Sequence, residues 1–227
     1  MAIEELTFAV DDQRRVSALL ARPRNARALL VLGHGAGAGM RHPFLEGTTD
    51  RLGRLGIATL RYQFPYMERG LRRPDAAPVL CRTVRAAVKQ ARRAGHGLPL
   101  LAGGKSMGGR MTSLAASEET LAGVSGLVFL GFPLHAPGKR SAERGEHLRE
   151  VRLPMLFLQG TRDRLADLEL LRPLLAKLGA RATLHVVEGG DHSFHVPKRS
   201  GRTDDEALDE LAAAVDGWVR RMVEGQR

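Results

Sequence analysis

The sequence predicts an α/β fold, in which a mostly parallel sheet is covered by helices on both faces. Short apolar runs that are typical of strands buried on both faces recur along the chain, as at Ala28–Gly33. Segments with helical spacing of apolar residues separate these runs, as at 76–94. No internal repeat or linker is visible, so we expect a single domain over residues 1–227.

Strands and helices are predicted to follow one another along the chain. Two strands open it, near 4–10 and 15–21, with a polar turn at Asp11-Asp12-Gln13 between them. The other predicted strands lie at 28–33, 57–61, 98–102, 124–129, 155–159 and 182–187. The predicted helices lie at 43–54, 76–94, 107–117, 165–178 and from Thr203 to about Met222.

Apolar residues at helical spacing predict which faces of the helices are buried. One stripe lies in the 76–94 helix, at Leu80, Val84, Ala87, Val88 and Ala91. Another runs along the final helix, at Leu208, Leu211, Ala212, Val215, Trp218, Val219 and Met222. That helix begins with Thr203-Asp204-Asp205-Glu206, which matches a capping box. We therefore expect Trp218 to be a core residue.

Composition favours a cytoplasmic protein. The N-terminus is acidic (Met1-Ala2-Ile3-Glu4-Glu5), so no signal peptide is expected. No run approaches the roughly 18 apolar residues of a membrane span, and we expect no membrane association. The single cysteine, Cys81, cannot form an internal disulfide and lies on the inner side of a predicted helix, where we expect it to be inert.

The formal net charge of +10 is distributed rather than concentrated. Basic residues occur as scattered pairs, such as Arg72-Arg73 and Arg92-Arg93, and only two tyrosines are available for stacking on bases. This pattern argues against a nucleic-acid partner. The chain also has no Cys/His cluster with metal-binding spacing, so no metal is expected.

The motif that carries chemistry is Gly103-Gly104-Lys105-Ser106-Met107-Gly108-Gly109, directly after the apolar run 98–102. It contains the G-x-S-x-G pattern of a nucleophile elbow, a tight turn from a strand into a helix. Small residues two before and two after the serine let the strained turn pack without clashes. The N-terminus of the following helix favours negative charge beside the hydroxyl. The pattern predicts that Ser106 is a nucleophile.

A serine needs a base, and the base needs a carboxylate to orient it. The chain offers Asp163 after the strand at 155–159 and His192 after the last strand, in the order Ser, Asp, His. Residues at the carboxyl ends of parallel strands meet at one edge of the sheet. We therefore predict Asp163 and His192 as acid and base.

Three nearby residues compete with these two candidates. Asp167 is predicted to lie on the following helix. Asp191 adjoins His192 in sequence and is poorly placed to face its ring. His195 lies farther from the end of the last strand than His192.

Two backbone amides are needed to stabilise an oxyanion. We predict the amide of Met107, directly after the nucleophile, and that of Ala36 in the glycine-rich loop His34-Gly35-Ala36-Gly37-Ala38-Gly39. For His34 itself we expect a structural role in shaping this loop. Lys105 and Arg110 flank the elbow and could meet an anionic substrate, but solvated or ion-paired roles are at least as reasonable.

Two motifs for phosphate or dinucleotide binding fail. Gly104-Lys105-Ser106 resembles the end of a P-loop, but the first glycine of that motif would fall on Pro99. Gly33-x-Gly35-x-x-Ala38 resembles a dinucleotide fingerprint, but Arg61-Tyr62-Gln63 follows the next strand where an acidic residue is needed. No cofactor is therefore expected.

With these residues in place, the chain resembles the α/β-hydrolase superfamily over nearly its whole length. More narrowly, it resembles a small lidless, dienelactone-hydrolase-like family that includes a subunit of the nonspecific-lethal chromatin complex and a testis-expressed protein. The matching segments are 33–37, 61–66, 103–110, 159–163 and 190–194. Gln63 stands where that family is expected to have asparagine. The irregular, charged stretch at 135–152 is too short for a cap domain.

The resemblance implies that Ser106, Asp163 and His192 are nucleophile, acid and base. Together with the motifs it predicts a serine hydrolase that acts on a small-molecule carboxylic ester or thioester. The alternative is an interaction protein that keeps the fold without catalysis. Neither the acyl group nor the oligomeric state is predicted.

Overall fold

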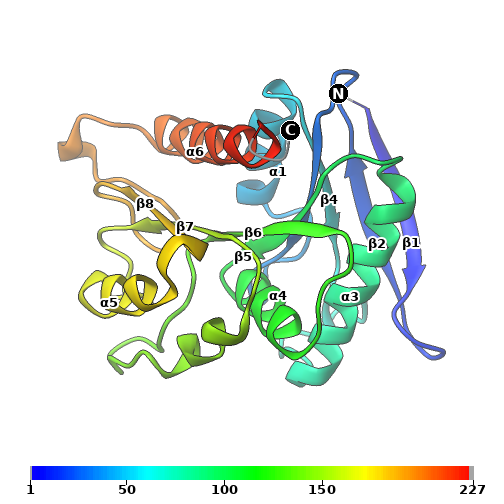
Figure 1. Cartoon of the computed structure of the whole chain (residues 1–227), viewed down its shortest axis with the longest axis horizontal. Coiled ribbons are helices and arrows are strands. Elements are labelled where there is room, and N and C mark those ends of the chain that lie inside the picture. Colours follow the sequence, from blue (N-terminus) through cyan, green and yellow to red (C-terminus); the bar gives the residue numbers. More distant parts are fainter. Residues whose placement is uncertain (1, 225–227) are drawn as a thin grey trace.

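In the computed structural model, which describes residues 2–224, eight strands form one sheet in the order β1-β2-β4-β3-β5-β6-β7-β8. Strands β3 to β8 are parallel to one another, whereas β2 pairs antiparallel with β1 on one side and with β4 on the other. Helices cover both faces (Figure 1). The predicted fold class is confirmed.

The strands are β1 (Ile3–Ala9), β2 (Arg15–Ala21), β3 (Ala28–Gly33), β4 (Ile57–Tyr62), β5 (Leu100–Lys105), β6 (Val124–Leu130), β7 (Met155–Gly160) and β8 (Ala182–Val187). The α-helices are α1 (Pro43–Arg54), α2 (Pro65–Glu68), α3 (Ala77–Ala94), α4 (Met107–Glu118), α5 (Leu168–Leu178) and α6 (Asp204–Glu224). Short 3-10 helices are η1 (Glu143–Glu150), η2 (Gly179–Arg181) and η3 (Lys198–Ser200).

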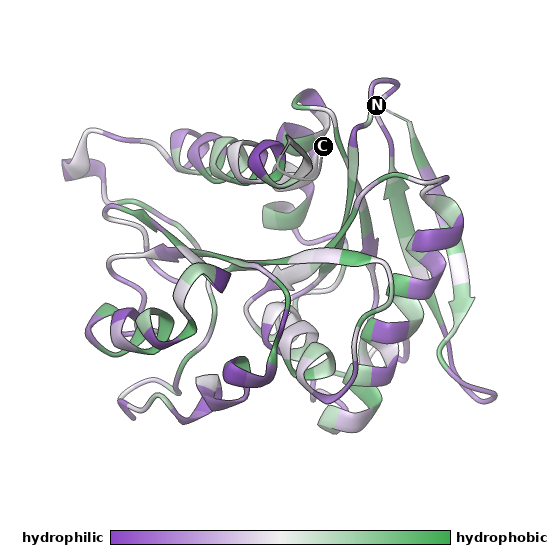
Figure 2. Ribbon diagram, viewed as in Figure 1, coloured by the Kyte–Doolittle hydropathy of each residue, from purple (hydrophilic) through white to green (hydrophobic). Residues whose placement is uncertain are grey.

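Two apolar layers pack against the two faces of the sheet. Helices α1 and α6 lie on one face, and α3, α4 and α5 lie on the other (Figure 1). Hydrophobic residues concentrate in the strands and on the helix sides that face them, and hydrophilic residues lie outward (Figure 2). Trp218 on α6 is only 4% exposed, which confirms the prediction that it is a core residue. Burial of these two layers is the main source of stability of the fold.

The structure differs from the predicted elements at two places near the site. Strand β5 continues through Gly103 and Gly104 to Lys105, because these residues still pair in parallel with β6. Helix α5 begins at Leu168, so Asp167 does not lie on the helix as predicted. Instead Asp167 is its N-cap, because its carboxylate accepts the Glu169 amide at 2.8 Å.

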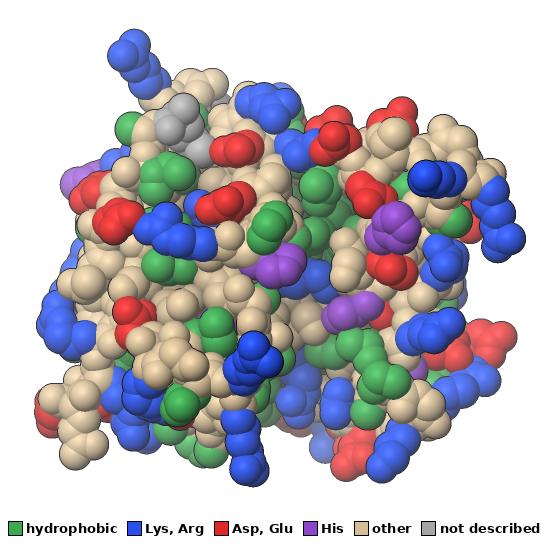
Figure 3. All heavy atoms as spheres, turned by 180° about the vertical axis from the view of Figure 1, so that it is seen from behind, with side chains coloured by type: hydrophobic (Ala, Val, Ile, Leu, Met, Phe, Trp, Pro, Cys, Tyr) green, Lys and Arg blue, Asp and Glu red, His purple; other side chains and the backbone are tan. Residues whose placement is uncertain are grey.

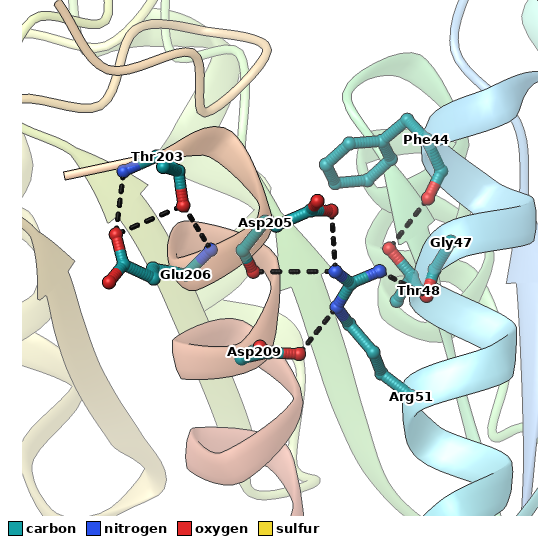
Figure 4. A network of polar contacts seen from close by, with 8 residues as sticks. All are labelled: Phe44, Gly47, Thr48, Arg51, Thr203, Asp205, Glu206 and Asp209. Atoms are coloured by element: carbon teal, nitrogen blue, oxygen red, sulfur yellow. Dashed lines mark hydrogen bonds and ion pairs between the residues drawn. The ribbon is translucent and has the colours of Figure 1, made fainter. Parts of the chain in front are cut away.

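The start of α6 is fixed both within the helix and against α1. The predicted capping box is confirmed, since Thr203 and Glu206 exchange hydrogen bonds between their side chains and backbone amides. Arg51 of α1 binds the carboxylates of Asp205 and Asp209 at 2.7 and 2.6 Å (Figure 4). This contact joins the two helices that cover one face of the sheet.

The charged stretch at 135–152 forms no cap. It contains η1, which packs against α4 through the buried side chain of Leu148. His147 of η1 lies 2.8 Å from the hydroxyl of Ser113 on α4. Among residues 2–224, therefore, no large domain lies above the carboxyl edge of the sheet, where β5, β7 and β8 end.

Candidate active site

Ser106 lies at the sharp turn between β5 and α4. Its φ of 51° is a strained conformation for a residue with a side chain. The glycines on either side are needed because the end of β3 lies directly against them. A Cβ on Gly104 or Gly108 would lie 2.3 or 2.2 Å from the carbonyl oxygen of Gly33. The prediction that small residues allow this turn is confirmed.

The structure brings Ser106, His192 and Asp163 together at the carboxyl ends of β5, β8 and β7. Nε2 of His192 lies 2.8 Å from Oγ of Ser106, and Nδ1 lies 2.7 Å from Oδ2 of Asp163. An ionised carboxylate only accepts hydrogen bonds, so we assign the ring hydrogen to Nδ1. Nε2 is then free to accept the hydroxyl proton, as a general base must.

Asp163 is held by hydrogen bonds from its own loop and from β7. Its side chain is 0% exposed. Oδ1 accepts the Leu165 amide at 2.8 Å, while Oδ2 accepts the side-chain amide of Gln159 as well as the His192 ring. Gln159 in turn accepts the Phe132 amide at 3.0 Å, which fixes its orientation. Sequence analysis did not identify Gln159, although a glutamine inside a buried strand before the acid loop was a usable signal.

The rival carboxylates serve their own loops. Asp167 caps α5, as described above. Asp191 accepts the backbone amides of Ser193 and His195 at 2.7 and 3.0 Å. In the described part of the chain, neither carboxylate is hydrogen-bonded to the His192 ring.

Within residues 2–224 the rival base, His195, makes no hydrogen bond to Ser106. His195 is exposed, and its Nδ1 lies 2.8 Å from Oδ2 of Asp204 on α6. That hydrogen bond raises the pKa of His195 and lowers the pKa of Asp204. His195 therefore ties the loop after β8 to α6.

The glycine-rich loop (residues 34–40) is held by side chains that follow β4. Oη of Tyr66 accepts the Gly37 amide at 2.9 Å. Oε1 of Gln63 accepts the Met40 amide at 2.8 Å. Two neutral acceptors from one short segment thus fix the loop that passes the nucleophile.

His34 begins this loop and shapes it. It is fully buried, its Nε2 accepts the Phe64 amide at 3.1 Å, and its Nδ1 lies 2.7 Å from the Gly35 carbonyl oxygen. Burial lowers the pKa of His34 to about 4, so the ring is neutral at pH 7. These contacts agree with the predicted structural role.

Two amides near Ser106 are available to a ligand. Within residues 2–224 the amides of Ala36 and Met107 have no acceptor, whereas those of Gly37, Ala38 and Met40 are bonded. Met107 is the first residue of α4, where the helix dipole favours negative charge. Ala36 lines the same cavity as Ser106.

A cavity of about 340 Å³ opens beside Ser106 and His192. Most of its wall is apolar, and it is formed in part by Ala36, Ala38, Phe44, Leu45 and Leu165. No acidic side chain of the described residues lines it. Such a cavity suits a small uncharged or anionic group more than a cationic one.

Lys105 and Arg110 have contacts that the sequence did not predict. Lys105 is half-buried and lines the cavity, and its ammonium donates to the His192 carbonyl at 2.6 Å rather than pairing with a carboxylate of the described residues. Arg110 lies partly buried on α4, and burial lowers its pKa.

Cys81 is buried in the core, and burial raises the pKa of its thiol to about 11, as expected of an inert thiol.

The surface of the molecule carries charged side chains of both signs. On the face in Figure 3, Lys and Arg side chains alternate with Asp and Glu, and His side chains lie near its middle. Across residues 2–224 no group of three or more His, Cys, Asp or Glu side chains is placed to hold a metal ion. None of the helices within that range is long and apolar enough to cross a bilayer.

A comparison with known families matches residues 26–220 to the family described as alpha/beta hydrolase domain. Similar folds occur among solved structures. A dienelactone hydrolase from Anabaena variabilis has a TM-score of 0.75 and 20% identity, with 97% of each chain covered. A lidless α/β serine hydrolase from Xanthomonas campestris has a TM-score of 0.72 and 20% identity, covering 95% of this chain and 94% of that one.

Est1E from Butyrivibrio proteoclasticus, solved with ferulic acid, is a further similar structure. Its TM-score is 0.73 at 17% identity, with 96% of this chain and 99% of that chain covered. At these identities the likeness concerns the fold. It agrees with a hydrolase built without a large cap domain.

Proposed function

The chain belongs to the alpha/beta hydrolase domain family, and from that premise we propose that it is a serine hydrolase that cleaves small carboxylic esters or thioesters. One observation carries this proposal. A continuous line of hydrogen bonds runs from the buried carboxylate of Asp163 through the imidazole of His192 to the hydroxyl of Ser106. A serine in this arrangement can lose its proton to the ring as it attacks a carbonyl carbon.

The first half of the reaction forms an acyl-enzyme. Oγ of Ser106 attacks the acyl carbon while its proton passes to Nε2 of His192. The imidazolium is stabilised by the carboxylate of Asp163 at Nδ1. Its proton then goes to the oxygen or sulfur of the leaving group as the carbon–heteroatom bond breaks. In the second half, a water attacks the acyl carbon by the same route and frees Ser106.

Negative charge on the carbonyl oxygen is stabilised by the amides of Met107 and Ala36. Both amides lack acceptors in the described chain and lie on the two segments that flank Ser106. Backbone donors held in place before the reaction need no reorganisation when the charge develops. One such donor is worth about 10²–10³-fold in rate in serine hydrolases.

The size of the cavity supports short acyl groups. A volume of about 340 Å³ with an apolar wall holds a small acyl chain. The absence of a cap in the described chain leaves the mouth of the cavity open to solvent, which suits substrates that dissolve in water.

Hydrolysis of p-nitrophenyl esters of graded acyl length tests the proposal. We expect turnover that is highest for short acyl chains, and a loss of about 10³-fold or more in Ser106→Ala. Ser117→Ala is the matched control, because Ser117 lies on the same helix but does not line the cavity. Activity that survives in Ser106→Ala would refute the mechanism.

A fluorophosphonate probe separates the enzyme from a non-catalytic protein with the same fold. The probe reacts with an activated serine, so mass spectrometry should find the adduct on the peptide that contains Ser106. Folded wild-type protein that hydrolyses none of the esters and is not labelled at Ser106 would favour the interaction-protein alternative.

A further inference from the structure

Lys105 is a half-buried lysine on the wall of the cavity, and within residues 2–224 no carboxylate forms an ion pair with its ammonium. It is the last residue of β5 and directly precedes Ser106. Within residues 2–224 the only hydrogen bond of its side chain is the one from Nζ to the carbonyl oxygen of His192, at 2.6 Å. A charge that is partly withdrawn from water and lacks an ion pair needs other stabilising contacts, so the contacts of this ammonium call for a functional explanation.

Two aromatic rings complete the surroundings of this ammonium. Nζ lies 5.7 Å from the centre of the Phe44 ring and 5.6 Å from the centre of the Phe194 ring. The two rings are stacked, with centres 5.8 Å apart and planes 15° apart. An ammonium near the faces of aromatic rings is stabilised by their quadrupoles, and more so away from water.

Gly131, directly after β6, leaves the space that this arrangement needs. A Cβ there would lie 3.0 Å from Nζ of Lys105 and 3.6 Å from Cε1 of His192. Its φ of 71° is also unfavourable for a residue with a side chain. Lys105 and the candidate base thus share one tight space at the end of β6.

The loop that Lys105 contacts is strained close to His192. Phe194 has a φ of 63°, which is uncommon for a residue with an aromatic side chain. Phe44 sits at the start of α1, which Arg51 joins to α6 (Figure 4). A strained conformation persists only where surrounding contacts hold it. The ammonium and the Phe44 ring are such contacts.

We propose that Lys105 is a positioning residue: by holding the carbonyl of His192 and the ring of Phe194, it keeps the His192 imidazole between Asp163 and Ser106. This inference rests on the proposed function. The G-x-S-x-G motif allows any residue directly before the serine. The proposal gives the lysine at this position a positioning role. Misplacing a catalytic group by about 1 Å can cost about 10²-fold in rate.

The charge of Lys105 gives the inference a pH signature. A charged donor makes a hydrogen bond about twice as strong as a neutral one, and only the charged form has the cation–π contacts. Burial lowers the pKa of Lys105 to about 8, although the carboxylates of Asp163 and Asp191 favour the charged form. His192 and, in the same cavity, His42 are the other titratable groups near it. The contacts of Lys105 with the loop after β8 should therefore weaken as the pH rises through about 8.

The test compares fluorophosphonate labelling of Ser106 in wild type, Lys105→Met and Lys89→Met from pH 6.5 to 9.5. Methionine keeps the length and removes the charge, and Lys89 is an exposed lysine on α3 that serves as the control. At pH 7 we expect Lys105→Met to label about 10- to 100-fold more slowly than wild type, and Lys89→Met to equal it. Above pH 8 the advantage of wild type over Lys105→Met should shrink.

The outcomes separate this inference from the proposed function. Circular dichroism and urea titration confirm that the variants are folded before rates are compared. Rapid labelling of wild type together with equal labelling of Lys105→Met, or with a ratio that does not change with pH, would overturn the role of Lys105 alone. No labelling of wild type at any pH would overturn the proposed function itself.

Discussion

Two loops at the carboxyl edge of the sheet carry the inner histidines His34 and His192, yet the two loops are held in different ways. Two amides of the glycine-rich loop after β3 are held by the neutral acceptors Gln63 and Tyr66, and one charged group, Arg61, donates to the Met40 carbonyl at the end of the loop. The loop after β8 (residues 188–196) is fixed by charged groups, which are Lys105 on β5, Asp191 within the loop and Asp204 on α6.

The surroundings of His34 and His192 show how this difference between the loops bears on function. The ring nitrogens of His34 contact backbone groups, and its ring is fully buried against Phe64 and Tyr66 and is neutral at pH 7. His192 has a carboxylate at one nitrogen, a serine hydroxyl at the other and a side chain that is 24% exposed. A histidine after a strand is therefore a candidate base only when its two nitrogens face an acid and a nucleophile. The loop with the candidate oxyanion amide of Ala36 is held mainly by neutral acceptors, whereas the loop with the candidate base His192 is held by charged groups.

The largest expected effect separates the two histidines of the second loop. His192→Ala should reduce kcat/KM for a p-nitrophenyl ester by about 10⁴-fold or more, because Ser106 loses its base. His195→Ala, three residues on and paired with Asp204, should change it by less than about 3-fold. Equal losses in both variants would show that the loop as a whole, rather than one ring, carries the activity.

Asp163→Asn replaces the carboxylate at the ring of His192. This carboxylate distinguishes the surroundings of His192 from those of His34. An amide at this position favours the wrong tautomer of His192, so kcat should fall by about 10³-fold. Asp167→Asn is the control, since asparagine caps a helix about as well as aspartate. A variant of Asp163 that keeps wild-type kcat would contradict its role as the orienting acid.

The pH dependence of stability tests the neutral histidine. The pKa of His34 is about 4 in the folded protein and near 6.5 when unfolded, so the unfolded state binds more protons between these values. The free energy of unfolding should therefore fall as pH drops, by about 2 kcal/mol from this group between pH 7 and pH 5.

Urea unfolding of wild type and His34→Gln at pH 7 and pH 5 measures this contribution. The variant should lose less stability than wild type over the same interval, since glutamine does not titrate. His147, whose pKa burial also lowers to about 4, is present in both proteins and cancels. An identical loss in the two proteins would mean that His34 does not report on acid destabilisation.

The smallest expected effect concerns one hydrogen bond to the glycine-rich loop. Tyr66→Phe removes the acceptor of the Gly37 amide and should lower kcat about 3- to 10-fold, with little change in KM. Tyr62→Phe is the matched control, because its buried hydroxyl makes no hydrogen bond to the loop. A drop of similar size in the control would point to general loosening of the core.

Much of the fold followed from local patterns. The strands at 28–33 and 182–187 and the helix at 43–54 have the predicted bounds, because each is set by burial and turn residues within a few positions. The start of α5 did not follow from local patterns. Asp167 is the N-cap of this helix, and the sequence alone does not distinguish a capping residue from the first residue of a helix.

The candidate site, like the fold, was predicted only in part from the sequence. The sequence alone determined where the reactive residue types lie, because a nucleophile elbow and strand ends are read from neighbouring residues. The roles of Ser106, Asp163 and His192 are predictions that the variants above test, and the roles of the Met107 and Ala36 amides also remain predictions. The tertiary structure adds that the three side chains share continuous hydrogen bonds.

Only the tertiary structure decided what holds these groups in place. Lys105 reaches a carbonyl 87 residues away, and Gln63 reaches an amide 23 residues away. A lysine or glutamine has the same local sequence signature whether it is solvated or buried, because its partner is chosen by how the sheet brings distant loops together. Local propensity places the elements, and long-range packing selects the partner of each polar side chain.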